Sequence, residues 1–132
     1  MASNAMEVVE RFEALFMEGD LQKVLEVVGE DIVTYEAPSL PYAGAHVGHE
    51  GWLQLAAAFT DTWEPTGELH CEFLDCGNNV VAARVELDVV ARSTGKPVQL
   101  RIAEFHKVRG GKIRETTIYY WDTAAMLEAL TP

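Results

Sequence analysis

Apolar residues recur three or four positions apart in three stretches of the first half of the chain. The first runs over residues 6–18, the second over residues 20–29 and the third over residues 52–63. This spacing places the apolar side chains on one side of an α-helix, so it predicts three amphipathic helices. Gly19 and Pro65 end the first and the third of them.

The period changes in the second half, where apolar and polar residues alternate. Strands are predicted over residues 69–75, 80–92, 98–108 and 112–122, with a short earlier strand over residues 31–36. Short turns that contain Gly, Asn or Ser join the last four strands, which is typical of an antiparallel meander. About three helices that precede such a run of strands predict an α+β domain with an antiparallel sheet.

The strand over residues 80–92 alternates most regularly and leaves two interpretations open. Apolar side chains such as Val85 share one face, and Arg84 and Glu86 share the other. Either the apolar face packs on the helices and the charged face meets water, or the apolar face forms a dimer interface. In the second case Arg84, Glu86 and Arg101 point into the concavity under the helices, where opposite charges must pair to offset the cost of burial.

The chain has 132 residues and a net charge of −11 at pH 7, which fits a single domain and disfavours binding to nucleic acid or to anionic membranes. No apolar run is long enough to span a bilayer and no secretion signal is recognisable, so we expect a cytoplasmic protein. Ser3-Asn4-Ala5 directly before Met6 looks like the remnant of an expression tag. The domain is therefore expected to span residues 6–132, without residues 1–5.

Several motifs resemble those of one superfamily in their order and spacing. The motifs that resemble the opening of bacterial ketosteroid isomerases are Val9-Glu10-Arg11-Phe12, Gly19-Asp20-Leu21 and Tyr35-Glu36-Ala37-Pro38. Those that look like parts of SnoaL-like domains are Gly48-His49-Glu50-Gly51-Trp52, Gly110-Gly111-Lys112-Ile113 and Tyr120-Trp121-Asp122. Together they cover nearly the whole chain from Met6, which is thus identified as a member of the nuclear transport factor 2-like, SnoaL-like superfamily.

The resemblance implies a cone-shaped sheet that encloses a pocket for a small molecule, and a homodimer that forms through the outer face of the sheet. It favours the second interpretation of the alternating strand. Relatives isomerise, cyclise or hydrolyse small molecules, and others only bind them. We therefore expect a cofactor-free isomerase, cyclase or hydrolase that uses acid–base carboxylates on a mainly apolar substrate. The alternative is a non-catalytic ligand-binding or dimeric accessory domain.

The proton-carrying carboxylate of ketosteroid isomerases matches Glu36, which precedes a long loop over residues 37–49 at the expected mouth of the pocket. Apolar surroundings would raise the pKa of Glu36 above its ordinary value of about 4.3. The two oxyanion-hole positions of those enzymes match Phe12 and Ala103. Neither side chain donates a hydrogen bond, so isomerisation of steroids is not expected.

Four residues are the catalytic candidates: Glu36, Asp122, Arg84 and Glu86. Arg84-Val85-Glu86 resembles the Arg-x-Asp pair of limonene epoxide hydrolases, with Asp122 as a shifted substitute for their later aspartate. Asp122 also suits the N-cap of a last helix, and Arg84 with Glu86 a structural ion pair, so both alternatives stay open. The candidate ligand-binding residues are Phe12, Tyr35, His49, Phe59, Trp63, Arg101, Ala103 and Tyr120. No metal site is predicted, because His46 and His49 lack the spacing of a metal motif and a third ligand.

Overall fold

The computed structural model describes residues 4–132 of the chain. In chain order the elements are α1 (Asn4–Glu18), α2 (Leu21–Val24), β1 (Val28–Glu36), β2 (Gly44–Val47), α3 (Gly48–Thr62), β3 (Trp63–Pro65), β4 (His70–Gly77), β5 (Val80–Ala91), β6 (Pro97–Arg109), β7 (Lys112–Tyr120) and α4 (Thr123–Leu130). None of the helices in these residues is long and apolar enough to cross a membrane.

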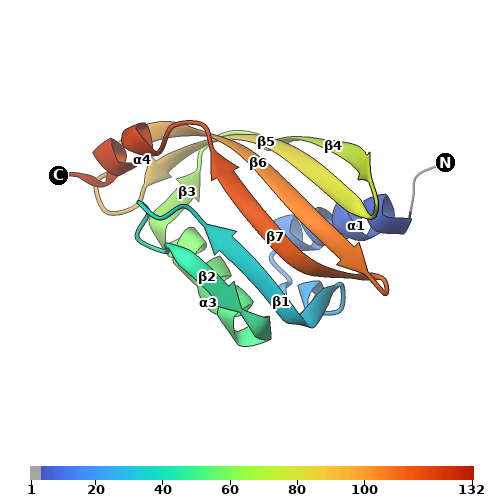
Figure 1. The fold of residues 1–132 in the computed structure, drawn as a ribbon. Helices are drawn as coiled ribbons and strands as arrows, with labels where there is room; N and C mark the ends of the chain where they lie inside the picture. Colours follow the sequence, from blue (N-terminus) through green and yellow to red (C-terminus); the bar gives the residue numbers. More distant parts are fainter. Residues whose placement is uncertain (1–3) are drawn as a thin grey trace.

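The strands form one strongly curled sheet in the order β2-β1-β7-β6-β5-β3, with β4 also paired to β5 (Figure 1). The four long strands from β4 to β7 make the expected antiparallel meander. The α+β prediction is confirmed, but the sheet is mixed because β1 runs parallel to β7. A parallel pair requires a long connection between its strands, and α3 together with the meander supplies it.

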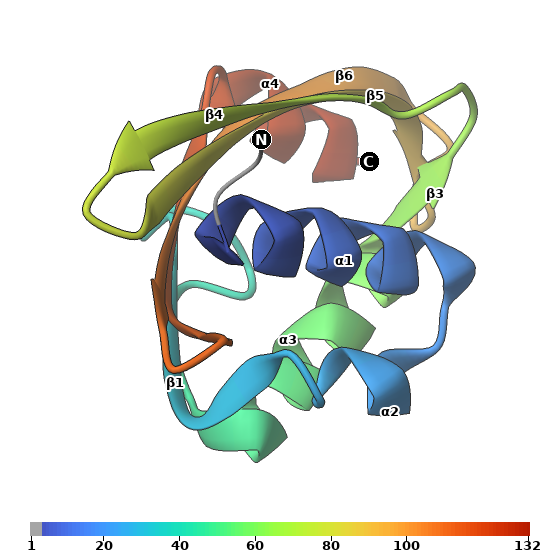
Figure 2. The ribbon, with the colours of Figure 1, turned by 90° about the vertical axis from the view of Figure 1, so that its right-hand side faces the viewer.

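The concave side of the sheet holds α1 (Figure 2). Val8, Val9, Phe12 and Leu15 are buried along one stripe of this helix, as their spacing predicts. Gly19, at a φ of 79°, provides the left-handed turn after its last residue. The helix begins at Asn4 and Ala5 is 2% exposed, so residues 4 and 5 belong to the fold although they were expected to lie outside it. Residues 1–3 of the segment interpreted as a tag remnant lie outside the described residues.

The apolar face of β5 and β6 turns toward the helices. The residues that define this face and are buried within one chain are Val81, Val85, Leu87, Leu100 and Ile102. The first of the two interpretations therefore holds, and the expectation that this face forms a dimer interface is wrong. The apolar residues of α1 and α3 pack with this face in the core.

The segment over residues 37–49, expected to be an open loop, is more ordered than its Pro and Gly content suggests. It contains β2, which pairs with β1 from Val33 opposite Val47 to Glu36 opposite Gly44. Leu40 and Tyr42 are buried in the core. Four residues are too few to show a strand period, which explains why the sequence pattern missed β2.

Candidate functional site

A cavity of about 110 Å³ is lined by residues of the concave face of the sheet, of α1 and of α3. Aromatic rings from the two helices line it, namely Phe12, Phe16, Trp52 and Phe59. Met17 at the end of α1 also lines the cavity and is half exposed, so the cavity reaches the surface there. Its polar lining residues are Glu13, Thr34, Glu36, Glu104, His106, Thr116 and Tyr120. Among the described residues, no Lys or Arg lines this cavity.

Glu36 is the last residue of β1, and its side chain points inward because Tyr35 before it points outward. The residue is only 6% exposed. Burial raises the pKa of Glu36 to about 8, although a hydrogen bond from Tyr120 favours the ionised form and lowers the pKa. The charge of Glu104 also raises the pKa of Glu36. Its Oε1 atom has no hydrogen-bond partner within residues 4–132.

A chain of hydrogen bonds between aromatic side chains leads to the carboxyl group of Glu36. The indole Nε1 of Trp63 donates to the hydroxyl of Tyr42 over 2.9 Å. Tyr120 hydrogen-bonds to both Tyr42 and Glu36. Burial raises the pKa of Tyr42 to about 12 and also raises the pKa of Tyr120, so both phenols keep their protons. Trp63, which was expected to bind the ligand, is 1% exposed and acts through this chain without lining the cavity.

A second polar group, which we call the Glu104 cluster, consists of Glu13, Glu104, His106 and Thr116. The Nδ1 atom of His106 lies 2.8 Å from the Thr116 hydroxyl, and its Nε2 atom lies 3.1 Å from Oε1 of Glu104. The side chains of Glu13 and Glu104 hydrogen-bond to each other. The carboxylate and imidazole atoms of Glu13, Glu104 and His106 lie within 4.8 Å of one another, close enough for a metal ion to join them.

Burial dominates the protonation of this cluster. It raises the pKa of Glu13 well above the usual value, and the charge of Glu104 adds to this effect. It also raises the pKa of Glu104, although the hydrogen bond from Glu13 opposes it. Burial lowers the pKa of His106 to about 4, so the imidazole is neutral at pH 7.

Sequence reasoning missed the Glu104 cluster, although the pattern contains a signal for it. On β6 the apolar face of Leu100 and Ile102 continues into Glu104 and His106 at the same period of two. Ala103 and Phe105 instead continue the outward face. Polar residues that extend an apolar face are buried polar groups, and such groups often mark a site.

Three of the expected ligand-binding residues, Phe12, Phe59 and Tyr120, line the cavity with Glu36. Arg84, Glu86, Arg101 and Ala103 do not, because they lie on the outer face of the sheet around a shallow hollow. There Arg101 pairs with Glu86 over 3.8 Å, and Arg84 pairs with Glu72 over 4.0 Å. The expectation that these charges point into the concavity is wrong, because the apolar half of the alternation occupies it.

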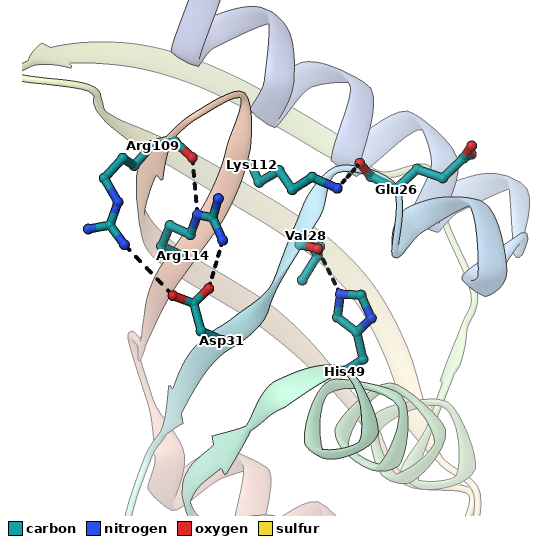
Figure 3. A network of polar contacts seen from close by, with 7 residues as sticks. All are labelled: Glu26, Val28, Asp31, His49, Arg109, Lys112 and Arg114. Atoms are coloured by element: carbon teal, nitrogen blue, oxygen red, sulfur yellow. Dashed lines mark hydrogen bonds and ion pairs between the residues drawn. The ribbon is translucent and has the colours of Figure 1, made fainter.

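The remaining candidates also lie outside the cavity. Asp122 caps α4, where its side chain accepts a hydrogen bond from the amide of Ala125 over 3.0 Å. Tyr35 is exposed on the outer face. The Nε2 atom of His49 lies 2.8 Å from the carbonyl of Val28 and so joins the start of α3 to β1 (Figure 3). His46 makes a similar contact with the carbonyl of Tyr42 over 2.8 Å.

The polar contacts around His49 are structural. Figure 3 shows that Arg114 and Arg109, from the β6–β7 hairpin, both face Asp31 on β1. Lys112 donates to the carbonyl of Glu26 over 3.2 Å. These contacts hold the hairpin against the start of β1, whereas Glu36 is the last residue of that strand.

Residues 9–116, most of the chain, match the family model for the SnoaL-like domain. The chain belongs to the SnoaL-like family.

No curated protein matches its sequence. An NTF2-like protein from Burkholderia xenovorans is 25% identical, with a TM-score of 0.87 over 97% of this chain and 96% of that one. A protein from Mesorhizobium loti, described as a SnoaL-like polyketide cyclase, is 28% identical, with a TM-score of 0.72 over 86% of this chain and 97% of that one. A protein from Bacillus subtilis described as an isomerase is 20% identical and shares the fold, with a TM-score of 0.78 over 96% of this chain and 92% of that one.

Proposed function

We propose that this SnoaL-like protein is an enzyme that moves a proton on a small, mainly apolar molecule, with Glu36 as the proton carrier. One observation carries the proposal: a buried carboxyl group with an unpartnered oxygen lines an apolar cavity. The pKa of Glu36, raised to about 8, lies near neutral pH. A group with such a pKa both gives and takes protons efficiently under physiological conditions.

The size of the cavity limits the substrate. Its volume is about 110 Å³, and an apolar cavity of about 150 Å³ is known to accept benzene. A substrate of roughly one ring fits this space, whereas a steroid would require it to widen. Isomerase and cyclase descriptions of structurally similar proteins support proton transfer next to a carbonyl group as the reaction class.

Glu36 and Tyr120 have different roles in this proposal. Tyr120 holds one side of the carboxyl group and fixes its orientation, which leaves Oε1 to exchange a proton with a carbon atom of the substrate. The ionised carboxylate removes a proton next to the carbonyl group, and the resulting acid returns it to another carbon atom. The number of protons is unchanged over the cycle, as an isomerisation requires.

The proposal is tested by solvent deuterium exchange. A panel of single-ring ketones, such as cyclohexanone and 2-cyclohexenone, is incubated with the protein in D₂O and followed by ¹H NMR. Glu36→Gln should lower the catalysed rate by about a hundredfold or more, because the amide keeps the shape but carries no transferable acid proton. Glu72→Gln, on the exposed outer face, is the matched control and should keep the rate. A wild-type rate equal to that of buffer for every ketone, or an unchanged rate in Glu36→Gln, would contradict the proposal.

We also propose a homodimer through the outer face of the sheet, supported by residues other than those first expected. Phe105, Tyr119 and Trp121 are 40%, 58% and 74% exposed on this face. The rings of Phe105 and Tyr119 meet edge to face at 5.9 Å, and the Arg101 guanidinium lies 4.8 Å from the Trp121 ring. An exposed group of aromatic rings beside an arginine is typical of a protein interface.

A further inference from the structure

Glu104 is held from two sides by neutral hydrogen-bond donors. In the tautomer of His106 that carries its proton on Nε2, this proton points at Glu104 and Nδ1 accepts a hydrogen bond from the Thr116 hydroxyl. On the other side, Glu13 and Glu104 share a hydrogen bond, and two carboxyl groups can do so only when at least one of them carries a proton. With Glu104 ionised, the Glu104 cluster contains one proton, on Glu13, between two carboxyl groups and a neutral imidazole, and its net charge is −1. Burial opposes this form, because it raises the pKa of Glu104.

Within residues 4–132, nothing in the cavity compensates this charge. Arg84 on β5, which pairs with Ala103 beside Glu104, and Arg101 on β6 lie on the opposite face of the sheet. Glu104 and Glu36 line the same cavity, and the charge of Glu104 raises the pKa of Glu36. An uncompensated buried charge is costly, which is why burial raises the pKa of Glu104. An occupant that brings a positive charge removes this cost and favours the ionised carboxylate.

Two further oxygen atoms of the cavity lack partners within the described chain. They are Oε1 of Glu36 and Oγ1 of Thr34, in residues that are 6% and 3% exposed. A buried oxygen without a partner is destabilising unless a ligand or water supplies a hydrogen bond. Beside the Glu104 cluster, the cavity therefore offers two unpartnered oxygen atoms to a molecule with hydrogen-bond donors.

Aromatic rings lie directly beside the cluster. The ring of Phe12 is 5.6 Å from that of His106 and 6.0 Å from that of Trp52, and Phe16 is 6.1 Å from Trp52. The faces of such rings attract an organic cation, and their surface is suited to a flat apolar group.

We propose that the cavity binds a ring-sized molecule that carries a protonated amine, with the ammonium group at Glu104 and the ring among Phe12, Phe16 and Trp52. This inference rests on the proposed function only in taking the same cavity as the binding site, and it names the class of ligand. An ammonium group has three donors and no acceptor, which suits a site rich in acceptors. A carboxylate or phosphate would meet like charge and no cation, so anionic ligands are excluded from the site.

A single positive charge fits the cluster better than a metal dication does. An ammonium ion neutralises the net charge of −1 and leaves both the Glu13–Glu104 and the His106–Glu104 hydrogen bonds in place. A divalent metal held by Glu13, Glu104 and His106 must expel the proton between the carboxyl groups and break the contact between His106 and Glu104. The hydrogen bonds of the cluster thus favour the amine.

The test compares three ligands that differ only in their polar group: benzylamine, benzyl alcohol and benzoate. Isothermal titration calorimetry of the full chain at pH 7 and low salt should give a dissociation constant for benzylamine that is about tenfold or more below that of benzyl alcohol. Benzoate should not bind measurably. Binding of the alcohol or of benzoate as tight as that of the amine would overturn the proposal, and this comparison needs no variant.

A variant then assigns the charge to Glu104. Glu104→Gln should weaken benzylamine about tenfold and leave benzyl alcohol within about twofold, while Glu72→Gln on the outer face should change neither. An unchanged affinity of Glu104→Gln for benzylamine would contradict the assignment. If Zn²⁺ displaces benzylamine from the wild type but not from Glu104→Gln, the cluster would instead be assigned to a metal.

The outcome is separable from that of the proposed function, because this experiment measures binding and the other measures exchange. Loss of deuterium exchange in Glu36→Gln together with tight benzylamine binding by the wild type supports both claims. Exchange that depends on Glu36, with no preference for the amine, removes only the claim about the ligand. A preference for the amine without exchange removes only the enzymatic claim.

Discussion

Two buried carboxyl groups of one cavity differ in the partners around them. Glu104 accepts hydrogen bonds from Glu13 and His106, whereas Glu36 has Tyr120 on one side and an unpartnered oxygen on the other. The donors around Glu104 therefore favour its ionised form against the effect of burial, whereas Glu36 suits a proton that is exchanged with a substrate. The same residue type performs two roles because the neighbouring donors differ.

The raised pKa of Glu36 makes stability depend on pH in a defined direction. Its pKa is 4.5 in the ordinary state and about 8 in the fold, so the folded chain holds a proton that the unfolded chain releases between these values. The free energy of unfolding therefore falls as pH rises from about 4.5 to 8, by an amount of order 5 kcal/mol at most. Relative to wild type, Glu36→Gln should gain stability from pH 5 to pH 9, as measured by urea unfolding. A difference between the two proteins that does not change with pH would contradict this prediction.

At the residue level the sequence pointed to Glu36 through its motif and through the strand that it ends. It did not reveal Glu13, whose position in a helix gives no sign of the strand that it faces. Glu104 and His106 were recognisable only as polar residues that continue the apolar face of β6. Arg84 and Glu86 were predicted as site residues instead, because the sequence shows which residues share a face of the sheet but not which face the helices cover.

At the level of elements, α4 depends on a single cap. Asp122 accepts from the amide of Ala125, and Met126 and Ala129 pack the helix on the core. Asp122→Ala should lower the free energy of unfolding by about 1 kcal/mol, because the first turn loses its acceptor, and Asp122→Asn should keep most of it. Chemical denaturation measures both. Deuterium exchange of the ketones should be unaffected in either variant, and a rate that falls with Asp122→Asn would return this residue to the list of catalytic groups.

The elements themselves were largely predictable. The first helix, the third helix and the four strands of the meander follow from apolar periods that extend over many residues. By contrast, α2 is only one turn long, and β2 and β3 are short strands whose pairing decides their conformation. The parallel pairing of β1 with β7 is a long-range contact, and no local pattern of either strand encodes it.

At the level of the whole molecule, the side of the sheet covered by helices determines where a partner copy can bind. The concave side is filled by the helices and the cavity, so the outer face remains for a dimer. Tyr119→Arg should shift sedimentation at micromolar concentration toward the 14.6 kDa monomer, because it places an extra charge among the aromatic rings. Asp61→Arg, an exposed substitution on α3, is the control and should leave the assembly unchanged. A wild-type chain that sediments as a monomer would contradict the proposed dimer.

The central claim, that the cavity of this SnoaL-like protein holds Glu36 as a proton carrier, is tested most directly by titrating that carboxyl group. The ¹³Cδ signals of protein labelled at glutamate are followed by NMR from pH 4 to pH 10, and the signal missing in Glu36→Gln identifies residue 36. A buried Glu36 should titrate with a midpoint near pH 8, far above that of exposed glutamates. A midpoint near 4.5, the ordinary value, would mean that Glu36 is solvated and ionised at neutral pH, and would contradict the claim.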